Sequence, residues 1–217
     1  MADALVDLTF YELKKKGIEP KGEYIRKIIP IREYNYNDYI SWDDDVRREL
    51  IDGVVYQMAS PSEWHQWVTM EISRQLGNFL EGKKCTTYIA PFDVRLFYEE
   101  DGSDNTVVQP DILVVCDESK TLGFNYCKGS PDFVIEVASP GTRTIDIAEK
   151  RFNYEKAGVK EYWIVDKDRV YQYNLVNGVY KETIYKITTG LKIKTEAIKG
   201  CVINFSGIFE RYSSGKV

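Results

Sequence analysis

Two apolar stretches decide the fold of this chain, VVQPDILVVC (Val107–Cys116) and SPDFVIEVASP (Ser130–Pro140). Short runs rich in Val and Ile, bounded by Pro, Gly or Ser, are typical of buried strands. The first run predicts a strand over Val107–Val115. Each run is interrupted by a single carboxylate, Asp111 in the first and Glu136 in the second. The two strands and their acids are therefore the starting point for both fold and function.

The residues after Glu136 predict a strand–helix–strand unit. A strand over Phe133–Val137 is followed by the breaker Ser139-Pro140-Gly141, and then by a helix over about Thr144–Ala157 that Gly158 ends. A buried strand, Tyr162–Val165, comes directly after it. This order predicts a right-handed crossover between two parallel neighbours.

Local signals place further elements on both sides of these strands. Asp-Gly and Asn-Gly between apolar runs indicate hairpins, and Ser60-Pro61-Ser62 is a helix cap before an apolar stripe at helical spacing. The expected elements are a helix over Leu5–Lys16, a hairpin over Glu49–Met58, a helix over Glu63–Glu81, a β-rich segment over Thr86–Tyr98, a polar turn over Glu99–Asn105, and a hairpin pairing Val170–Asn174 with Val179–Tyr185. The pattern predicts an α/β fold with a mixed β-sheet core flanked by helices and extra β-hairpins at both ends.

Composition limits the classes of protein. A chain of 217 residues with 43% hydrophobic and 29% charged residues suits one domain with a sizeable core. The first residues lack the apolar segment of a signal peptide, and no apolar run approaches the roughly 18 residues that cross a bilayer. The net charge of −5 is unlike that of a protein that wraps a DNA duplex. Contact with nucleic acid would need a local basic patch, a metal ion or a dimer cleft.

The four cysteines, Cys85, Cys116, Cys127 and Cys201, contain no C-x-x-C pair and have no familiar zinc spacing with His65. We expect all four to be thiols in the reducing environment of the cytoplasm.

The two carboxylates have a structural and a functional interpretation. One buried acid is commonly paired with a nearby Arg or Lys. Two acids on adjacent strands would repel each other unless a cation lay between them, and a divalent ion would supply that charge. Lys150, about one turn inside the helix after Glu136, could lean back over the end of that strand. Alternatively it is a solvated lysine paired with Asp146 four residues earlier.

These motifs together resemble the Uma-two family of restriction-endonuclease-like proteins, which has the PD-(D/E)XK nuclease fold. The resemblance rests on QPD (Gln109–Asp111), PDFVIEVASP (Pro131–Pro140), Asp146–Lys150, GVKEYWIVD (Gly158–Asp166), ELIDG (Glu49–Gly53) and SPSEWH (Ser60–His65). It covers roughly Tyr39–Phe209. Residues 1–38 are then expected to form an N-terminal helical or extended segment, and residues 39–217 a single nuclease-type domain.

The resemblance implies Asp111 and Glu136 as ligands of Mg²⁺ or Mn²⁺ and Lys150 as the catalytic lysine. The wider superfamily would have its lysine at position 138, where this chain has Ala138. The resemblance implies that the lysine of this family lies instead on the following helix, a position that Lys150 matches. Glu49 matches a position near the metal; its alternative is a hairpin residue that faces solvent.

His65 matches as well, as a phosphate contact or as a group that orients Glu49. Its alternative is a structural residue at a helix start. Arg143 is a weaker candidate for phosphate contact.

The implied activity is metal-dependent hydrolysis of phosphodiesters in nucleic acid, with DNA favoured, by a cytoplasmic homodimer. Lys150 would orient the attacking water or offset charge, since a free lysine has a pKa near 10.4. Two alternatives remain. The chain could be a binding or assembly protein that keeps the nuclease fold without cutting. It could also be a glycosidase-like enzyme with Glu49 and Glu136 as its acid/base pair.

Overall fold

A computed structural model describes residues 33–138 and 146–213 of the chain, and within them the strands form three sheets. The six-stranded sheet has the order β11 (Val179–Lys186), β10 (Arg169–Val176), β9 (Glu161–Val165), β8 (Phe133–Val137), β6 (Ile112–Val115) and β3 (Thr86–Ile89). The five-stranded sheet has the order β2 (Val54–Gln57), β1 (Arg48–Ile51), β5 (Val107–Val108), β4 (Asp93–Arg95) and β7 (Tyr126–Lys128). A small pair joins β12 (Lys192–Lys194) to β13 (Val202–Asn204). The expected α/β class, with a mixed sheet and terminal hairpins, is confirmed.

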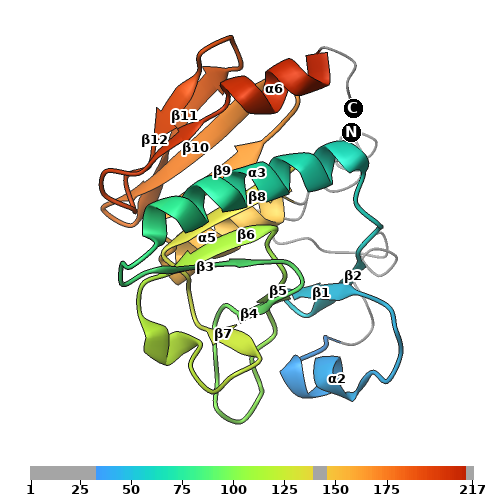
Figure 1. The fold of residues 1–217 in the computed structure, drawn as a ribbon. Helices are drawn as coiled ribbons and strands as arrows, with labels where there is room; N and C mark the ends of the chain where they lie inside the picture. Colours follow the sequence, from blue (N-terminus) through green and yellow to red (C-terminus); the bar gives the residue numbers. More distant parts are fainter. Residues whose placement is uncertain (1–32, 139–145, 214–217) are drawn as a thin grey trace, which may run out of the picture.

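Helices cover both faces of the six-stranded sheet (Figure 1). The helical segments are α2 (Tyr36–Ser41), α3 (Glu63–Leu80), a 3-10 turn (Glu118–Lys120), a π-helical turn (Asp146–Lys150), α5 (Arg151–Ala157) and α6 (Ser206–Ser213). Helix α3 crosses one face and forms the first hydrophobic core with it. Helix α5 lies on the opposite face, in a second core that also takes side chains from the five-stranded sheet. None of the helices in the described ranges is long and apolar enough to cross a membrane.

Local sequence signals explain the best-predicted elements. Helix α3 begins at the expected Ser62 cap, whose side chain accepts a hydrogen bond from the His65 backbone N–H. Its buried residues recur every four positions and form one stripe, Trp64, Val68, Ile72, Leu76 and Leu80. The β1–β2 turn takes left-handed conformations at Asp52 (φ 50°) and Gly53 (φ 79°), as an Asp-Gly hairpin requires. The β10–β11 hairpin forms in the same way.

The strand–helix–strand unit is confirmed, with a change at its middle. Strand β8 spans the predicted Phe133–Val137, and β9 pairs with it in parallel. The connecting helix is π-helical over Asp146–Lys150 and becomes α-helical from Arg151, and Gly158 ends it with a φ of 84°. Thr144, the expected start, lies outside the described residues, as does the predicted Leu5–Lys16 helix.

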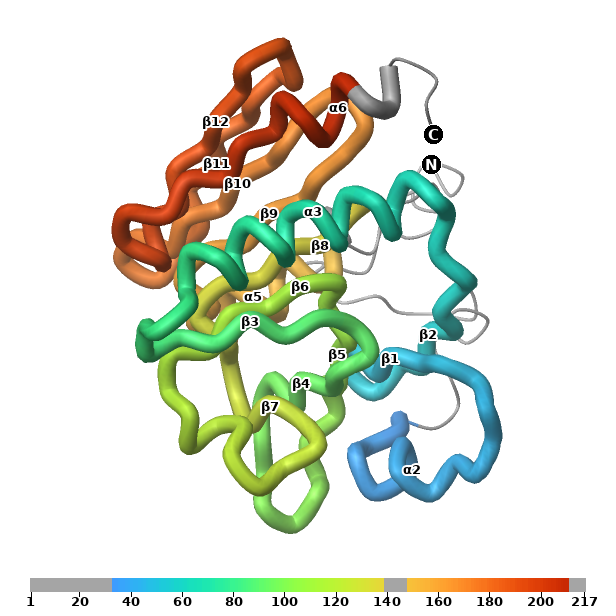
Figure 2. The backbone as a smooth tube through the Cα atoms, viewed as in Figure 1, coloured from blue at the N-terminus to red at the C-terminus, as the bar shows by residue number. Residues whose placement is uncertain are grey.

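The single strand predicted over Val107–Val115 is wrong, because the chain changes sheets within it. Strand β5 belongs to the five-stranded sheet and β6 to the six-stranded sheet, with Gln109-Pro110-Asp111 between them. Pro110 has no N–H to give to a ladder, so a break there is expected. Figure 2 shows the chain passing from one sheet to the other here, with β5 beside β1.

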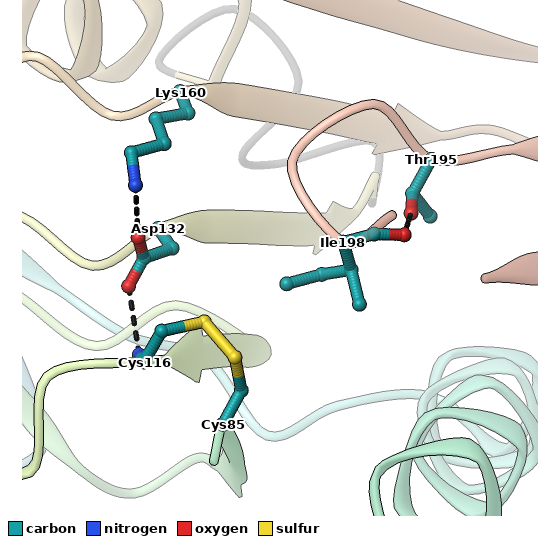
Figure 3. Close-up of a disulfide and its surroundings, with 6 residues drawn as sticks. All are labelled: Cys85, Cys116, Asp132, Lys160, Thr195 and Ile198. Atoms are coloured by element: carbon teal, nitrogen blue, oxygen red, sulfur yellow. Dashed lines mark hydrogen bonds and ion pairs between the residues drawn. A yellow bond between two sulfur atoms is a disulfide. The ribbon is translucent and has the colours of Figure 1, made fainter. Parts of the chain in front are cut away.

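The expectation that all four cysteines are thiols is also wrong. Cys85 and Cys116 form a disulfide (Figure 3). Cys127 and Cys201 are free and buried. Strands β3 and β6 pair antiparallel with Thr86 opposite Val115, so the positions one step further bring the two cysteines face to face. Disulfides are uncommon in a reducing cytosol, so cysteine usage no longer supports the predicted cytoplasmic location.

We expect the disulfide to stabilise the protein by about 2–4 kcal/mol, the usual range for a cross-link that restricts the unfolded chain. Urea unfolding with and without dithiothreitol measures this. Cys85→Ala should unfold like the reduced parent and should not respond to the reductant. Thiol titration of the oxidised, denatured parent should count two free thiols of four; a count of four would contradict the bond.

A buried carboxylate anchors the small β12–β13 sheet. Glu161 in β9 accepts hydrogen bonds at Oε1 from Trp163 Nε1 (2.6 Å) and Gln172 Nε2 (2.7 Å). Its Oε2 accepts from the backbone N–H groups of Glu196 and Ala197, both at 2.8 Å. Burial raises the pKa of Glu161, and these hydrogen bonds oppose that rise. The carboxylate therefore ties the turn after β12 to the main sheet.

Replacement of Glu161 by Gln should destabilise the fold. The amide nitrogen cannot accept the two backbone hydrogen bonds, and two unsatisfied buried donors cost about 2–4 kcal/mol. Urea unfolding measures the loss, with the exposed Glu81→Gln as the matched control. Equal stability of the two variants would show that the Glu161 network contributes nothing.

Candidate active site

Asp111 and Glu136 lie side by side, Asp111 at the residue before β6 and Glu136 within the neighbouring β8. Ile112 in β6 pairs with Ile135 in β8, so the next position along the ladder sets Asp111 opposite Glu136. Asp111 Oδ2 accepts a hydrogen bond from the Val137 backbone N–H at 2.7 Å, and the Asp111 N–H donates to Glu136 Oε2 at 3.3 Å. Both acids are buried. The two predicted carboxylates thus share one end and one face of the sheet.

Lys150 binds both Glu136 and Glu49. Its Nζ lies 3.0 Å from Glu136 Oε1 and 2.9 Å from Glu49 Oε1, and only 3% of the lysine is exposed. The alternative of a solvated Lys150 is therefore wrong. The partner named in that alternative, Asp146, has a side chain outside the part that the structure describes. The alternative of a solvent-facing Glu49 is wrong too, because Glu49 is 5% exposed and accepts a hydrogen bond from the Gln109 N–H at 2.7 Å.

Tyr154 is a site residue that the sequence analysis missed. Its hydroxyl donates to Glu136 Oε1 at 3.1 Å, the oxygen that Lys150 also contacts, and its side chain is fully buried. Tyr154 follows Lys150 by four residues, a spacing that puts two side chains on the same helical face. That spacing was the available signal, but an aromatic residue inside a helix is usually core.

The sequence analysis had suggested that His65 orients Glu49, but in the structure His65 contacts Asp111. The His65 Nε2 lies 3.0 Å from Asp111 Oδ2, and Ser62 at the helix cap fixes the start of α3. The buried Nδ1 has no hydrogen-bond partner among the described residues. Arg143, the remaining candidate, lies outside those residues.

The donors suit a hard divalent cation held by few protein ligands. Within the described ranges, no group of three or more His, Cys, Asp or Glu side chains has the arrangement of a metal cage. Mg²⁺ is commonly held by one or two carboxylates, with waters and substrate phosphate completing its shell. Asp111 and Glu136 supply two carboxylates, and Asp111 Oδ1 makes no hydrogen bond within the described part. The residues present therefore fit such an ion.

A polar network continues from Glu49 through Gln109, whose N–H and the Lys150 ammonium group both contact Glu49 Oε1. Gln109, whose N–H holds Glu49, uses its amide nitrogen to donate to Asp93 Oδ1 (2.8 Å) and to the Tyr39 hydroxyl oxygen (3.3 Å). Burial raises the pKa of Asp93, while hydrogen bonds from Gln109 and Tyr39 act against that rise. Burial also raises the pKa of Tyr39, with nearby Asp93 as the second cause.

The family follows from a match over most of the chain. Residues 36–205 match the model of Uma2, described as "Putative restriction endonuclease". The chain belongs to the Uma2 family. The resemblance of its motifs to this family is confirmed, and the family's description as a nuclease implies an enzyme that binds nucleic acid.

A solved structure supports the fold of this Uma2 protein. The crystal structure of a "putative nuclease belonging to DUF820" from Anabaena variabilis superposes with a TM-score of 0.66. Its sequence is 15% identical to that of this chain, and the match covers 82% of this chain and 98% of the Anabaena chain. At that identity the likeness concerns the fold alone. No curated protein matches the chain.

We expect Lys150→Met to destabilise the Uma2 fold by about 3–5 kcal/mol, because it leaves Glu49 and Glu136 buried without their cation. Adding Glu49→Gln should recover part of that loss by removing one of the two charges. A double-mutant cycle in urea measures the coupling. The exposed Lys160→Met is the control. Additive effects of Lys150→Met and Glu49→Gln would show that their ion pair contributes nothing.

Proposed function

We propose that this Uma2 protein is a metal-dependent endonuclease that hydrolyses phosphodiester bonds in nucleic acid, with DNA as its substrate. The observation that carries the proposal is the convergence of Asp111, Glu136 and Lys150 from two strands and a helix onto one end of the sheet. Two carboxylates with one lysine at a sheet end suit a phosphate that reacts beside a cation.

Asp111 and Glu136 would hold Mg²⁺ or Mn²⁺. The ion, when bound, would lower the pKa of a water and stabilise negative charge on the reacting phosphate. His65 orients Asp111 through Oδ2. Lys150 and Tyr154 both donate to Glu136 Oε1 and so fix the rotation of that carboxylate. Lys150 also places a positive charge beside the carboxylates, so we assign it an orienting and charge-offsetting role.

The same geometry argues against the glycosidase alternative. Glu49 and Glu136 are both within hydrogen-bonding distance of the one ammonium group of Lys150, so they are ion-paired. An acid/base pair for glycoside hydrolysis needs one carboxyl group protonated and a sugar between the two. The binding-protein alternative makes no demand on these contacts and is tested below.

A homodimer would place two such sites on the two strands of a duplex. Strand β11 supports this part of the proposal, since it forms an edge of the six-stranded sheet among the described strands and exposes Val179 and Ile184. Exposed edges are ready surfaces for pairing with another chain.

The roles of the three residues can be separated by metal binding and cleavage. Asp111→Asn and Glu136→Gln each remove a charged oxygen ligand, so affinity for the ion and cleavage should both fall. Lys150→Met removes positive charge near the ligands, so its affinity should stay equal or rise. Its cleavage should drop by about a hundredfold or more. Calorimetric titration and plasmid nicking measure both quantities on the same samples.

Far-ultraviolet circular dichroism checks that each variant is folded, and Lys160→Met should behave like the parent. If Lys150→Met cuts as fast as the parent, the role given to this lysine is wrong. If the folded parent cuts neither DNA nor RNA with Mg²⁺ or Mn²⁺, the non-cutting alternative is the better account.

A further inference from the structure

An open pocket of about 300 Å³ lies beside the candidate active site. Two of its lining residues adjoin site residues in the chain: Arg48 precedes Glu49, and Gln109 lies two residues before Asp111. Two residues of extended chain span about 7 Å, so the pocket is a short step from the carboxylates. Its walls include Tyr39, Trp42, Asp44, Arg47, Arg48 and Gln109.

The two arginines of the pocket differ in their partners. Arg48 is neutralised by Asp44, with bonds of 2.5 and 2.6 Å, and its guanidinium lies 5.2 Å from the centre of the Trp42 ring. Arg47 donates from Nε and Nη2 to Gln109 Oε1, a neutral acceptor, at 3.2 and 2.9 Å. Within the described residues no salt bridge joins Arg47 to a carboxylate, and Asp93 is the acid on which its charge acts from further away. Its positive charge is therefore available to an anion, and a guanidinium held by a neighbour suits phosphate.

The rest of the pocket suits a nucleobase. Trp42 and Tyr39 present aromatic rings whose centroids are 5.8 Å apart in an edge-to-face arrangement, and Trp42 is partly exposed. Bases stack on such rings whatever their sequence. The carboxylates of Asp44 and Asp45 can accept hydrogen bonds from N–H groups of a base, such as the N3–H of thymine, but they disfavour a second phosphate at this position.

Gln109 connects this pocket to the candidate active site. Its side-chain oxygen accepts the Arg47 hydrogen bonds, while its backbone N–H holds Glu49, the partner of Lys150. A ligand bound to Arg47 would therefore lie next to Gln109, the residue that positions Glu49.

We propose that this pocket, here called the Arg47 pocket, binds one nucleotide of the substrate strand next to the phosphate that reacts. Arg47 holds the phosphate of that nucleotide, and Trp42 stacks on its base. The proposal rests on the nuclease function proposed above, but its test requires no cleavage.

The test follows the Trp42 indole N–H signal by ¹H–¹⁵N NMR in EDTA, so that no divalent ion is bound. Trp42→Phe assigns the signal, and the core residue Trp163 is the internal reference. The probes are thymidine 5′-monophosphate, thymidine and inorganic phosphate. We expect the monophosphate to shift the Trp42 signal in a saturable way and the Trp163 signal to stay in place. Arg47→Gln should weaken monophosphate binding by about tenfold or more and leave thymidine binding unchanged.

Arg74→Gln is the matched control, because Arg74 is exposed on α3 and paired with Glu71. An unmoved Trp42 signal would overturn the Arg47 pocket, and cleavage by the same protein would then leave the nuclease proposal intact. Phosphate that binds as tightly as the monophosphate would also overturn it, since the base would then add nothing. Nucleotide binding in a protein that never cuts would support the pocket while the nuclease proposal fails.

Discussion

The buried ammonium group of Lys150 is the contact on which the arrangement of the site depends. Glu49 belongs to the five-stranded sheet and Glu136 to the six-stranded sheet, so one lysine on the connecting helix joins both. Burying three charges is expensive, and it becomes tolerable only when further hydrogen bonds satisfy the carboxylates. The Tyr154 hydroxyl and the Gln109 N–H supply such bonds. The site therefore also joins the two sheets to each other. A change in its geometry is expected to change the stability of the fold as well.

The sheet change at Gln109-Pro110-Asp111 makes this junction possible. On one side of Pro110, Gln109 holds Glu49 of the first sheet; on the other side, Asp111 stands next to Glu136 of the second. The neighbouring passage from β3 to β4 lies against it, since the Ala90 N–H donates to the Asp111 carbonyl at 3.1 Å. A continuous strand would have kept the two residues in one sheet. Because Pro110 interrupts the apolar run, each of the two sheets contributes residues to the site.

Local chemistry made part of this predictable. The Ser62 cap, the Asp52-Gly53 turn and the Phe133–Val137 strand each follow from a few adjacent residues, and the structure has them where the sequence indicated. The convergence of Asp111 with Glu136 was foreseeable because each is the single acid in an apolar run of the sequence. The predictions that were wrong concerned features that depend on the register of paired strands and on residues far apart in the sequence. The Cys85–Cys116 bond needs the β3–β6 alignment across 31 residues of sequence separation, and neither cysteine carries a local sign of it.

The charge of the site bears on how an acidic chain could handle phosphate. Asp111, Glu136 and Glu49 bring three carboxylates against the one ammonium group of Lys150, and the chain as a whole carries −5. Without a further cation, a phosphate approaching this point meets net repulsion, because Lys150 is already shared by two acids. A divalent ion on Asp111 and Glu136 would cancel this net negative charge and offer phosphate a ligand position, without any change elsewhere. Attraction would then be confined to the site, and the rest of an acidic surface would repel nucleic acid held in other orientations. On this reasoning the negative net charge of the chain favours binding of nucleic acid at a few positions over wrapping of a duplex.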